Sequence, residues 1–202
     1  MGGHQCGDVA SQLIVDSLAD VTLGKSFEAR ITAVRDCLVR VNNRLGQRAN
    51  FNAGRPNAVI GSTVVALLVE GLRAACVWAG DSRCYLWRER RLYQLSRDHS
   101  LCQSLVSDNR MCPNQAAQHP AAHALTRAVG AGAELHLDVV ELEVRQGDVF
   151  VLCSDGLYEA VDPQMLGDAL SIKSPRLSVD LLFDHVLRGA AADNLTAVVI
   201  RV

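Results

Sequence analysis

Three aspartates stand at the ends of apolar segments, where a backbone is held rigidly. Asp81 and Asp155 each follow an apolar run almost directly, and Asp193 stands just before the last apolar run of the chain. Glycine is adjacent to Asp81 and Asp155, and glycine lets an ion or a ligand approach the backbone closely. The spacing therefore predicts carboxylates at the corners of strands, in positions that can bind something.

Carboxylates gathered at one edge of a sheet repel one another unless a cation lies between them. Hard divalent cations such as Mg²⁺ and Mn²⁺ take oxygen ligands, so a shared metal site is one interpretation of the three aspartates. The other interpretation is that each aspartate closes its own turn, because Asp-Gly pairs are common in turns. Composition and spacing leave both interpretations open.

Six short motifs change the balance, because they occur together and in a fixed order. The motifs are Met1-Gly-Gly-His-Gln-Cys-Gly-Asp-Val-Ala-Ser11, Gly61-Ser-Thr63, Trp78-Ala-Gly-Asp-Ser-Arg83, Asp98-His-Ser100, Cys153-Ser-Asp-Gly-Leu157 and Asp193-Asn-Leu-Thr196. They resemble the motifs of the metal-dependent serine/threonine protein phosphatases, the type 2C group, in their compact bacterial form. The resemblance runs from Met1 to Val202.

The resemblance implies an α+β fold, an antiparallel β-sandwich flanked by helices on both sides in four α-β-β-α layers. It also implies a centre of two Mn²⁺ or Mg²⁺ ions at one end of the sandwich. Asp155 would match the aspartate that binds the metal pair, and Asp193 would match the carboxylate on the other metal. Asp81 would match a position that holds a weaker third metal. Residues 99–130 would form a mobile flap beside this site.

The implied reaction is hydrolysis of phosphoserine and phosphothreonine in proteins. Water activated by two metals attacks phosphorus, and this chemistry needs no protein nucleophile. The one Cys-x5-Arg spacing, from Cys84 to Arg90, falls on the strand predicted over 84–88 and not on a phosphate-binding loop, which argues against a phosphocysteine mechanism. The implied partners are phosphorylated proteins and a serine/threonine kinase that the enzyme opposes; a type VI secretion cluster is one setting we consider.

Two other functions remain open at this point. The first is a non-catalytic, phosphatase-like binding or regulatory module, and the second is a hydrolase of small phosphoesters. The presence of both Asp155 and Asp193 favours an enzyme over a scaffold. Turnover of a phosphopeptide compared with that of a small ester would separate the two enzymes.

Other polar residues are weaker candidates for the site. His4 is a candidate proton donor to a leaving alkoxide. We expect Asp98 to cap the helix that follows it, and Arg83 to brace its turn. His119 and His123 stand four residues apart, but a proline lies between them and no acidic residue is near, which argues against a zinc pair.

Helices are predicted wherever apolar residues recur every three or four positions. Residues 6–21 form one such segment. Residues 26–45 form another, with Ser26 as the cap and Gly46 as the end. Further helices are predicted over 100–111, 157–170 and 177–189.

Strands are predicted for β-branched and apolar runs that tight turns separate. These runs cover residues 62–69, 72–79, 84–88, 92–96, 135–144, 149–153 and 194–202, with a bulge expected at 139–140. Helices come in pairs between runs of strands, which indicates an α+β fold and not a doubly wound parallel sheet. Strands that are apolar on both faces must be covered on both faces.

Composition sets the remaining limits. With 202 residues, one domain can bury roughly 70% of its unfolded surface, so it needs no stabilising cross-links. A net charge of −2 argues against a nucleic-acid partner. Seven cysteines without a Cys-x-x-Cys pair are typical of buried thiols in a reducing compartment. No apolar run is long enough to span a membrane and no signal peptide is visible, so we expect a cytoplasmic protein.

The position of Met1 carries one more expectation. In the family, the Met-Gly-Gly-His motif is internal and follows a strand that ends in Asp-Gly, both of which help to hold the metal pair. We therefore expect residues 1–202 to form a single phosphatase-like domain that lacks its N-terminal strands. Such a chain would be inactive or poorly stable alone.

Overall fold

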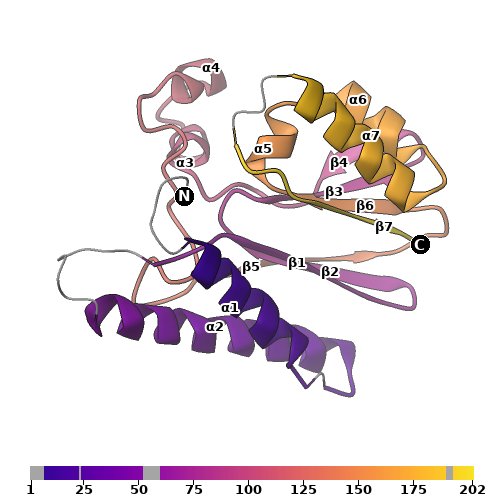
Figure 1. The fold of residues 1–202 in the computed structure, drawn as a ribbon. Coiled ribbons are helices and arrows are strands. Elements are labelled where there is room, and N and C mark those ends of the chain that lie inside the picture. The colour runs from indigo at the N-terminus through magenta and orange to yellow at the C-terminus, as the bar shows by residue number, and fades with distance from the viewer. Residues whose placement is uncertain (1–6, 23, 52–59, 190–192) are drawn as a thin grey trace. The chain divides into compact units, whose positions relative to one another are not determined.

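The computed structural model describes residues 7–22, 24–51, 60–189 and 193–202, apart from the side chains of 49–51 (Figure 1). Internal contacts divide the chain into two compact units, and each is described on its own. The first unit consists of residues 1–64, 77–81 and 98–139, and the second of residues 65–76, 82–97 and 140–202. The prediction of a single domain over 1–202 stays a prediction.

The helices of the first unit include a long antiparallel pair. These helices are α1 (Gly7–Ala19), α2 (Phe27–Phe51), α3 (Leu101–Ser107) and α4 (Pro113–Ala117). Helix α1 packs on α2 through residues such as Ala10 and Ile14, which are buried. The predicted cap of α2 is confirmed, since Ser26 Oγ accepts a hydrogen bond from Ala29 N at 3.2 Å.

The sequence predictions for the helices of this unit are wrong at three points. Helix α2 does not end at Gly46, because this glycine is not in the left-handed conformation that ends helices and good helix formers follow it. Helix α3 is capped by Ser100 and not by Asp98, since Ser100 Oγ accepts from Gln103 N. Helix α4 is the third difference, because no helix is predicted over residues 113–117.

The strands form two sheets. The three-stranded sheet has the order β1 (Val64–Glu70), β2 (Arg73–Ala79) and β5 (Asp138–Glu143). The four-stranded sheet has the order β4 (Arg91–Gln94), β3 (Arg83–Arg88), β6 (Val149–Cys153) and β7 (Ala197–Arg201), and all its pairs are antiparallel. The predicted α+β class, with antiparallel sheets and flanking helices, is confirmed. The expected bulge at 139–140 stays a prediction.

The four-stranded sheet lies in the second unit, and helices cover it. These are α5 (Asp155–Tyr158), α6 (Pro163–Leu170) and α7 (Pro175–Arg188), of which α6 and α7 lie side by side over the sheet (Figure 1). The single helix predicted over 157–170 is wrong. Asp162 begins a new helix there by accepting a hydrogen bond from Met165 N at 2.8 Å, and Pro163 occupies the first turn.

The central strand β6 is fixed at both of its ends. Phe150 and Val151 are fully buried, and β6 is hydrogen-bonded to β3 on one side and β7 on the other. At its beginning, the buried Asp148 forms a bidentate ion pair with Arg88 of β3, with N···O distances of 2.8 and 2.6 Å. Strand β6 therefore holds whatever follows its last residue in a fixed place.

Within the described parts of the chain, no helix combines the length and apolar character needed to cross a membrane.

Candidate metal centre

Asp155 follows β6 with only Ser154 between them, and it is the first residue of the one-turn helix α5. Its Oδ1 accepts a hydrogen bond from Gly156 N at 2.9 Å, and the residue is half-buried. The carboxylate is thus held at the end of a strand that is itself paired on both sides. This is the arrangement that the sequence predicted for Asp155.

Asp193 lies on a second corner, which precedes β7 and touches the first corner. A Cβ atom added to Gly156 would lie 2.4 Å from Asn194 O and 3.5 Å from the carbonyl carbon of Asp193. Only glycine permits this approach, so the Asp-Gly sequence is required by packing between corners and not by a turn alone. The structure therefore brings together the two backbone corners that carry Asp155 and Asp193, although these corners are far apart in the sequence.

Ser154 connects the two corners by hydrogen bonds. Its Oγ donates to Asn194 O at 3.3 Å and accepts from Thr196 N at 3.1 Å. Asp193 is exposed, and its Oδ1 accepts from Asn194 N at 2.7 Å. Each carboxylate is thus oriented by the amide that follows it, and the backbones that carry them are joined through one hydroxyl.

Asp81 belongs to the first unit, in the turn that follows β2. The preceding Gly80 has φ +117°, and a Cβ there would lie 2.4 Å from Thr63 Cγ2. Glycine is therefore required by both backbone conformation and space. The prediction that Asp81 adds a third metal position to the other two aspartates stays a prediction.

A buried histidine supports the Asp81 corner, and the sequence had assigned it no role. His99 Nδ1 accepts a hydrogen bond from Gly80 N at 3.2 Å, and His99 Nε2 lies 3.2 Å from Asp138 Oδ2. Burial lowers the pKa of His99, against the opposing effect of its hydrogen bond with Asp138. The signal was present in the Asp98-His-Ser100 motif, but its contact partners lie elsewhere in the chain.

The weaker candidates keep minor roles or lie outside the described residues. His4 is one of the residues that the structure does not describe. The guanidinium of Arg83 lies 3.6 Å from the centre of the Tyr158 ring on α5 and donates to Tyr85 Oη at 2.9 Å. Arg83 therefore braces the helix that Asp155 begins, whereas its predicted role in bracing its own turn stays a prediction. His119 Nδ1 accepts a hydrogen bond from Ala121 N.

The donor chemistry of the two joined corners fits a hard divalent cation. Asp155 and Asp193 offer carboxylate oxygens, which Mg²⁺ and Mn²⁺ prefer. Among the residues that the structure describes, no group of three or more histidines, cysteines, aspartates or glutamates is gathered closely enough to hold a metal ion by itself. That these two corners bind a metal stays a prediction.

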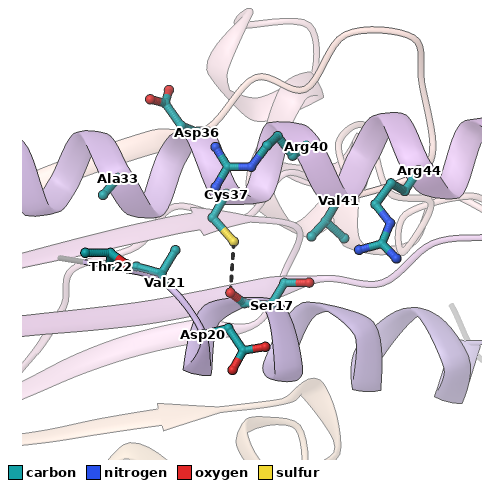
Figure 2. A pocket seen from close by; sticks show the side chains of 10 residues that line it. All are labelled: Ser17, Asp20, Val21, Thr22, Ala33, Asp36, Cys37, Arg40, Val41 and Arg44. Atoms are coloured by element: carbon teal, nitrogen blue, oxygen red, sulfur yellow. Dashed lines mark hydrogen bonds between the residues drawn. The ribbon is translucent and has the colours of Figure 1, made fainter.

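A hollow of about 560 Å³ lies in the first unit between α1 and α2 (Figure 2). Its floor includes Cys37, whose Sγ donates to Ser17 O at 3.2 Å. Two aspartates and two arginines line it, so its formal charges cancel: Asp20, Asp36, Arg40 and Arg44. Asp81, Asp155 and Asp193 are not among the residues that line this hollow.

Comparison with known sequences gives the same family as the motifs. The sequence model of protein phosphatase 2C matches residues 1–196. The serine/threonine protein phosphatase PstP of Mycobacterium tuberculosis (strain CDC 1551 / Oshkosh) is 36% identical over 202 residues, a match that covers 98% of this chain. The chain spans 38% of the length of that relative.

Solved structures give the same fold. PppA, described as a key regulatory component of T6SS in Pseudomonas aeruginosa, is 42% identical with a TM-score of 0.89, over 100% of this chain and 82% of that one. The catalytic domain of PstP in complex with two manganese ions is 34% identical with a TM-score of 0.80, over 98% of this chain and 83% of that one.

Proposed function

Because the chain belongs to the protein phosphatase 2C family, we propose that it hydrolyses phosphoserine and phosphothreonine in proteins with Mn²⁺ or Mg²⁺ as the cofactor. The observation that carries this proposal is the direct contact between the Asp155 and Asp193 corners. Asp155 and Asp193 stand on adjoining backbones that two paired strands of one sheet hold in place. In this proposal they are the part of the metal centre that lies in the second unit.

Asp155 and Asp193 would hold the metal pair, and Asp81 would hold a third, weaker ion. When bound, such ions lower the pKa of a water molecule and neutralise charge on the phosphoryl oxygens. The residues of the chain supply positioning: Ser154 joins the two corners, Gly156 lets them meet, and Arg83 braces α5. A positioned and charged site of this kind needs no cysteine nucleophile.

A non-catalytic binding module is the first alternative. It would have no need for two carboxylates on corners that only glycine allows to touch, so the geometry at Gly156 favours an enzyme. The second alternative, a hydrolase of small phosphoesters, differs only in its substrate. The relatives' names, serine/threonine protein phosphatase in the case of PstP, support a phosphoprotein substrate.

The direct test measures Mn²⁺-dependent release of phosphate from a phosphothreonine peptide and from p-nitrophenyl phosphate. We expect Asp155→Asn and Asp193→Asn each to reduce peptide turnover by at least about 100-fold, since each removes a charged ligand. Asp168→Asn is the matched control, because Asp168 is an exposed carboxylate on α6. Equal turnover in Asp155→Asn and the control would refute the assignment. A preference for the small ester over the peptide would support the second alternative.

The cellular setting is a further part of the proposal. A phosphoprotein phosphatase opposes a kinase, so a serine/threonine kinase is the expected partner. The 42% identity to PppA supports a role beside type VI secretion. The six cysteines that the structure describes are free thiols, which supports a cytoplasmic location.

A further inference from the structure

His99 exchanges hydrogen bonds with Gly80 in both directions. His99 N donates to Gly80 O at 2.9 Å, and Gly80 N donates to His99 Nδ1 at 3.2 Å. The imidazole also stacks on Trp78, with ring centres 6.0 Å apart and planes inclined by 15°. The backbone and the ring of His99 therefore both hold Gly80, the residue that precedes Asp81, by hydrogen bonds.

These contacts define which nitrogen of His99 carries the proton. Because Gly80 N–H is a donor, Nδ1 must accept, and the proton of a neutral ring lies on Nε2. Nε2 faces Asp138 Oδ2 at 3.2 Å. Arg127 Nη1 lies 3.3 Å from Nε2 and donates to the other oxygen of Asp138 at 2.7 Å. The arrangement is a relay from Asp138 through His99 to Gly80.

Burial makes this relay necessary. Gly80 is buried, and a buried N–H without an acceptor costs free energy. His99 is 6% exposed and lies beside the positive charge of Arg127, both of which disfavour a protonated ring. If His99 were protonated, both ring nitrogens would carry a proton, and Nδ1 could no longer accept the hydrogen bond from Gly80 N.

We propose that His99, held by Asp138, is a positioning residue for Asp81: its neutral imidazole fixes the Gly80–Asp81 corner and thereby directs the Asp81 carboxylate. The proposal rests on the proposed function for the role of Asp81 as a metal ligand. It adds three residues that support the site without touching substrate, namely His99, Asp138 and Arg127.

The test compares two substitutions of similar size at His99. His99→Asn keeps an acceptor at the place of Nδ1, whereas His99→Gln keeps a polar group at the place of Nε2 and loses the Nδ1 acceptor. Amide hydrogen exchange at Gly80, followed by NMR without metal or substrate, reads the corner directly. Calorimetry of Mn²⁺ binding then measures whether a change at this corner alters the affinity of the weaker third ion that Asp81 is proposed to hold.

We expect exchange at Gly80 to accelerate about tenfold in His99→Gln and to stay near that of the unmodified protein in His99→Asn. The weak Mn²⁺ affinity should fall with the same pattern. Unchanged exchange in His99→Gln, or equal acceleration in both variants, would overturn the proposal, because packing and not the acceptor would then decide. Neither measurement depends on turnover, so this pattern in a protein that does not hydrolyse a phosphopeptide would refute the proposed function alone.

A second pair of variants serves if His99→Gln does not fold. Asp138→Ala removes the group that orients the ring, and Glu141→Ala is its control on the same strand. Both carboxylates pair with an arginine and are similarly exposed, at 45% and 49% of the side chain. Faster exchange at Gly80 in Asp138→Ala alone supports the relay, and equal exchange in the two variants overturns it.

Discussion

Ser154 and Thr196 exchange hydrogen bonds in both directions. Ser154 N donates to Thr196 O at 3.1 Å, and Thr196 N donates to Ser154 Oγ at 3.1 Å. The first bond continues the ladder between β6 and β7, and the second replaces a backbone acceptor with a side chain. The ladder of hydrogen bonds therefore ends at the hydroxyl of Ser154. Beyond it the segments that carry Asp155 and Asp193 separate.

Ser154→Ala removes this hydroxyl and leaves the strands intact. We expect the free energy of unfolding to fall by only about 1 kcal/mol, the usual value of one partly exposed hydrogen bond. Turnover and Mn²⁺ affinity should fall about tenfold, because the Asp193 corner loses its connection to Asp155. Ser171→Ala is the control, since its Oγ also donates to a backbone carbonyl, at 2.9 Å, but at the C-terminal end of α6. Equal turnover in the two variants would contradict the role of Ser154.

Gly156→Ala tests the contact between the corners. A Cβ there would meet Asn194 O at 2.4 Å, and a backbone atom cannot move aside as a side chain can. We expect a loss of about 1–3 kcal/mol in the free energy of unfolding and a larger loss of Mn²⁺ binding. Gly46→Ala, where no atom lies within 4 Å of the added Cβ, should stabilise α2 by about 0.5–1 kcal/mol. Thermal melting and calorimetry measure both, and a neutral Gly156→Ala would show that the corners are farther apart.

The sequence predicted which residues stand at strand ends, because that information is local. An apolar run followed by Ser-Asp-Gly marks the end of β6 regardless of its partners, and Ser26 marks the beginning of α2 by itself. The start of α6 is equally local, since Asp162 followed by Pro163 marks it, but the apolar period that predicts one helix over 157–170 continues across this start.

Local sequence patterns could not predict which of these residues lie close together in the folded chain. The corner of Asp155 meets the corner of Asp193 because β6 pairs with β7 in the register that sets Cys153 opposite Ala197. His99 supports Gly80 through a contact that only the folded chain makes. The motifs indicated the family, but neither the role of Gly156 as a contact nor that of His99 as a support follows from residue types alone.

The ion pair of Arg88 with Asp148 predicts how stability depends on pH. Burial by itself would raise the pKa of Asp148, but hydrogen bonds from Arg88 and from Arg145 N, with the charge of Arg88, hold it below its ordinary value of 3.8. The folded pKa is thus lower than the unfolded one, so the pair stabilises the fold above the unfolded pKa. This contribution is lost as the pH falls through the folded pKa.

Asp148→Asn should therefore lower the free energy of unfolding at pH 7 and flatten its decline in acid. Urea titrations between about pH 7 and about pH 2 measure this, and the curves of the two proteins should approach each other below about pH 4. Arg88→Met should lower the free energy of unfolding at pH 7 by about 3–5 kcal/mol relative to the unmodified protein, because it leaves the buried carboxylate of Asp148 without its charged partner. Parallel curves for Asp148→Asn and the unmodified protein would contradict the prediction.

Asp155 and Asp193 should act as one unit in metal binding, and a double-mutant cycle tests this. If both carboxylates serve the same metal pair, removing the second after the first costs less than removing it alone. We expect the Mn²⁺ binding free energies of Asp155→Asn, Asp193→Asn and the double variant to differ from additivity by about 1–3 kcal/mol. Asp155→Asn combined with Asp168→Asn is the control cycle and should be additive within about 0.5 kcal/mol. Additivity in the first cycle would mean that the two corners, although in contact, bind nothing in common.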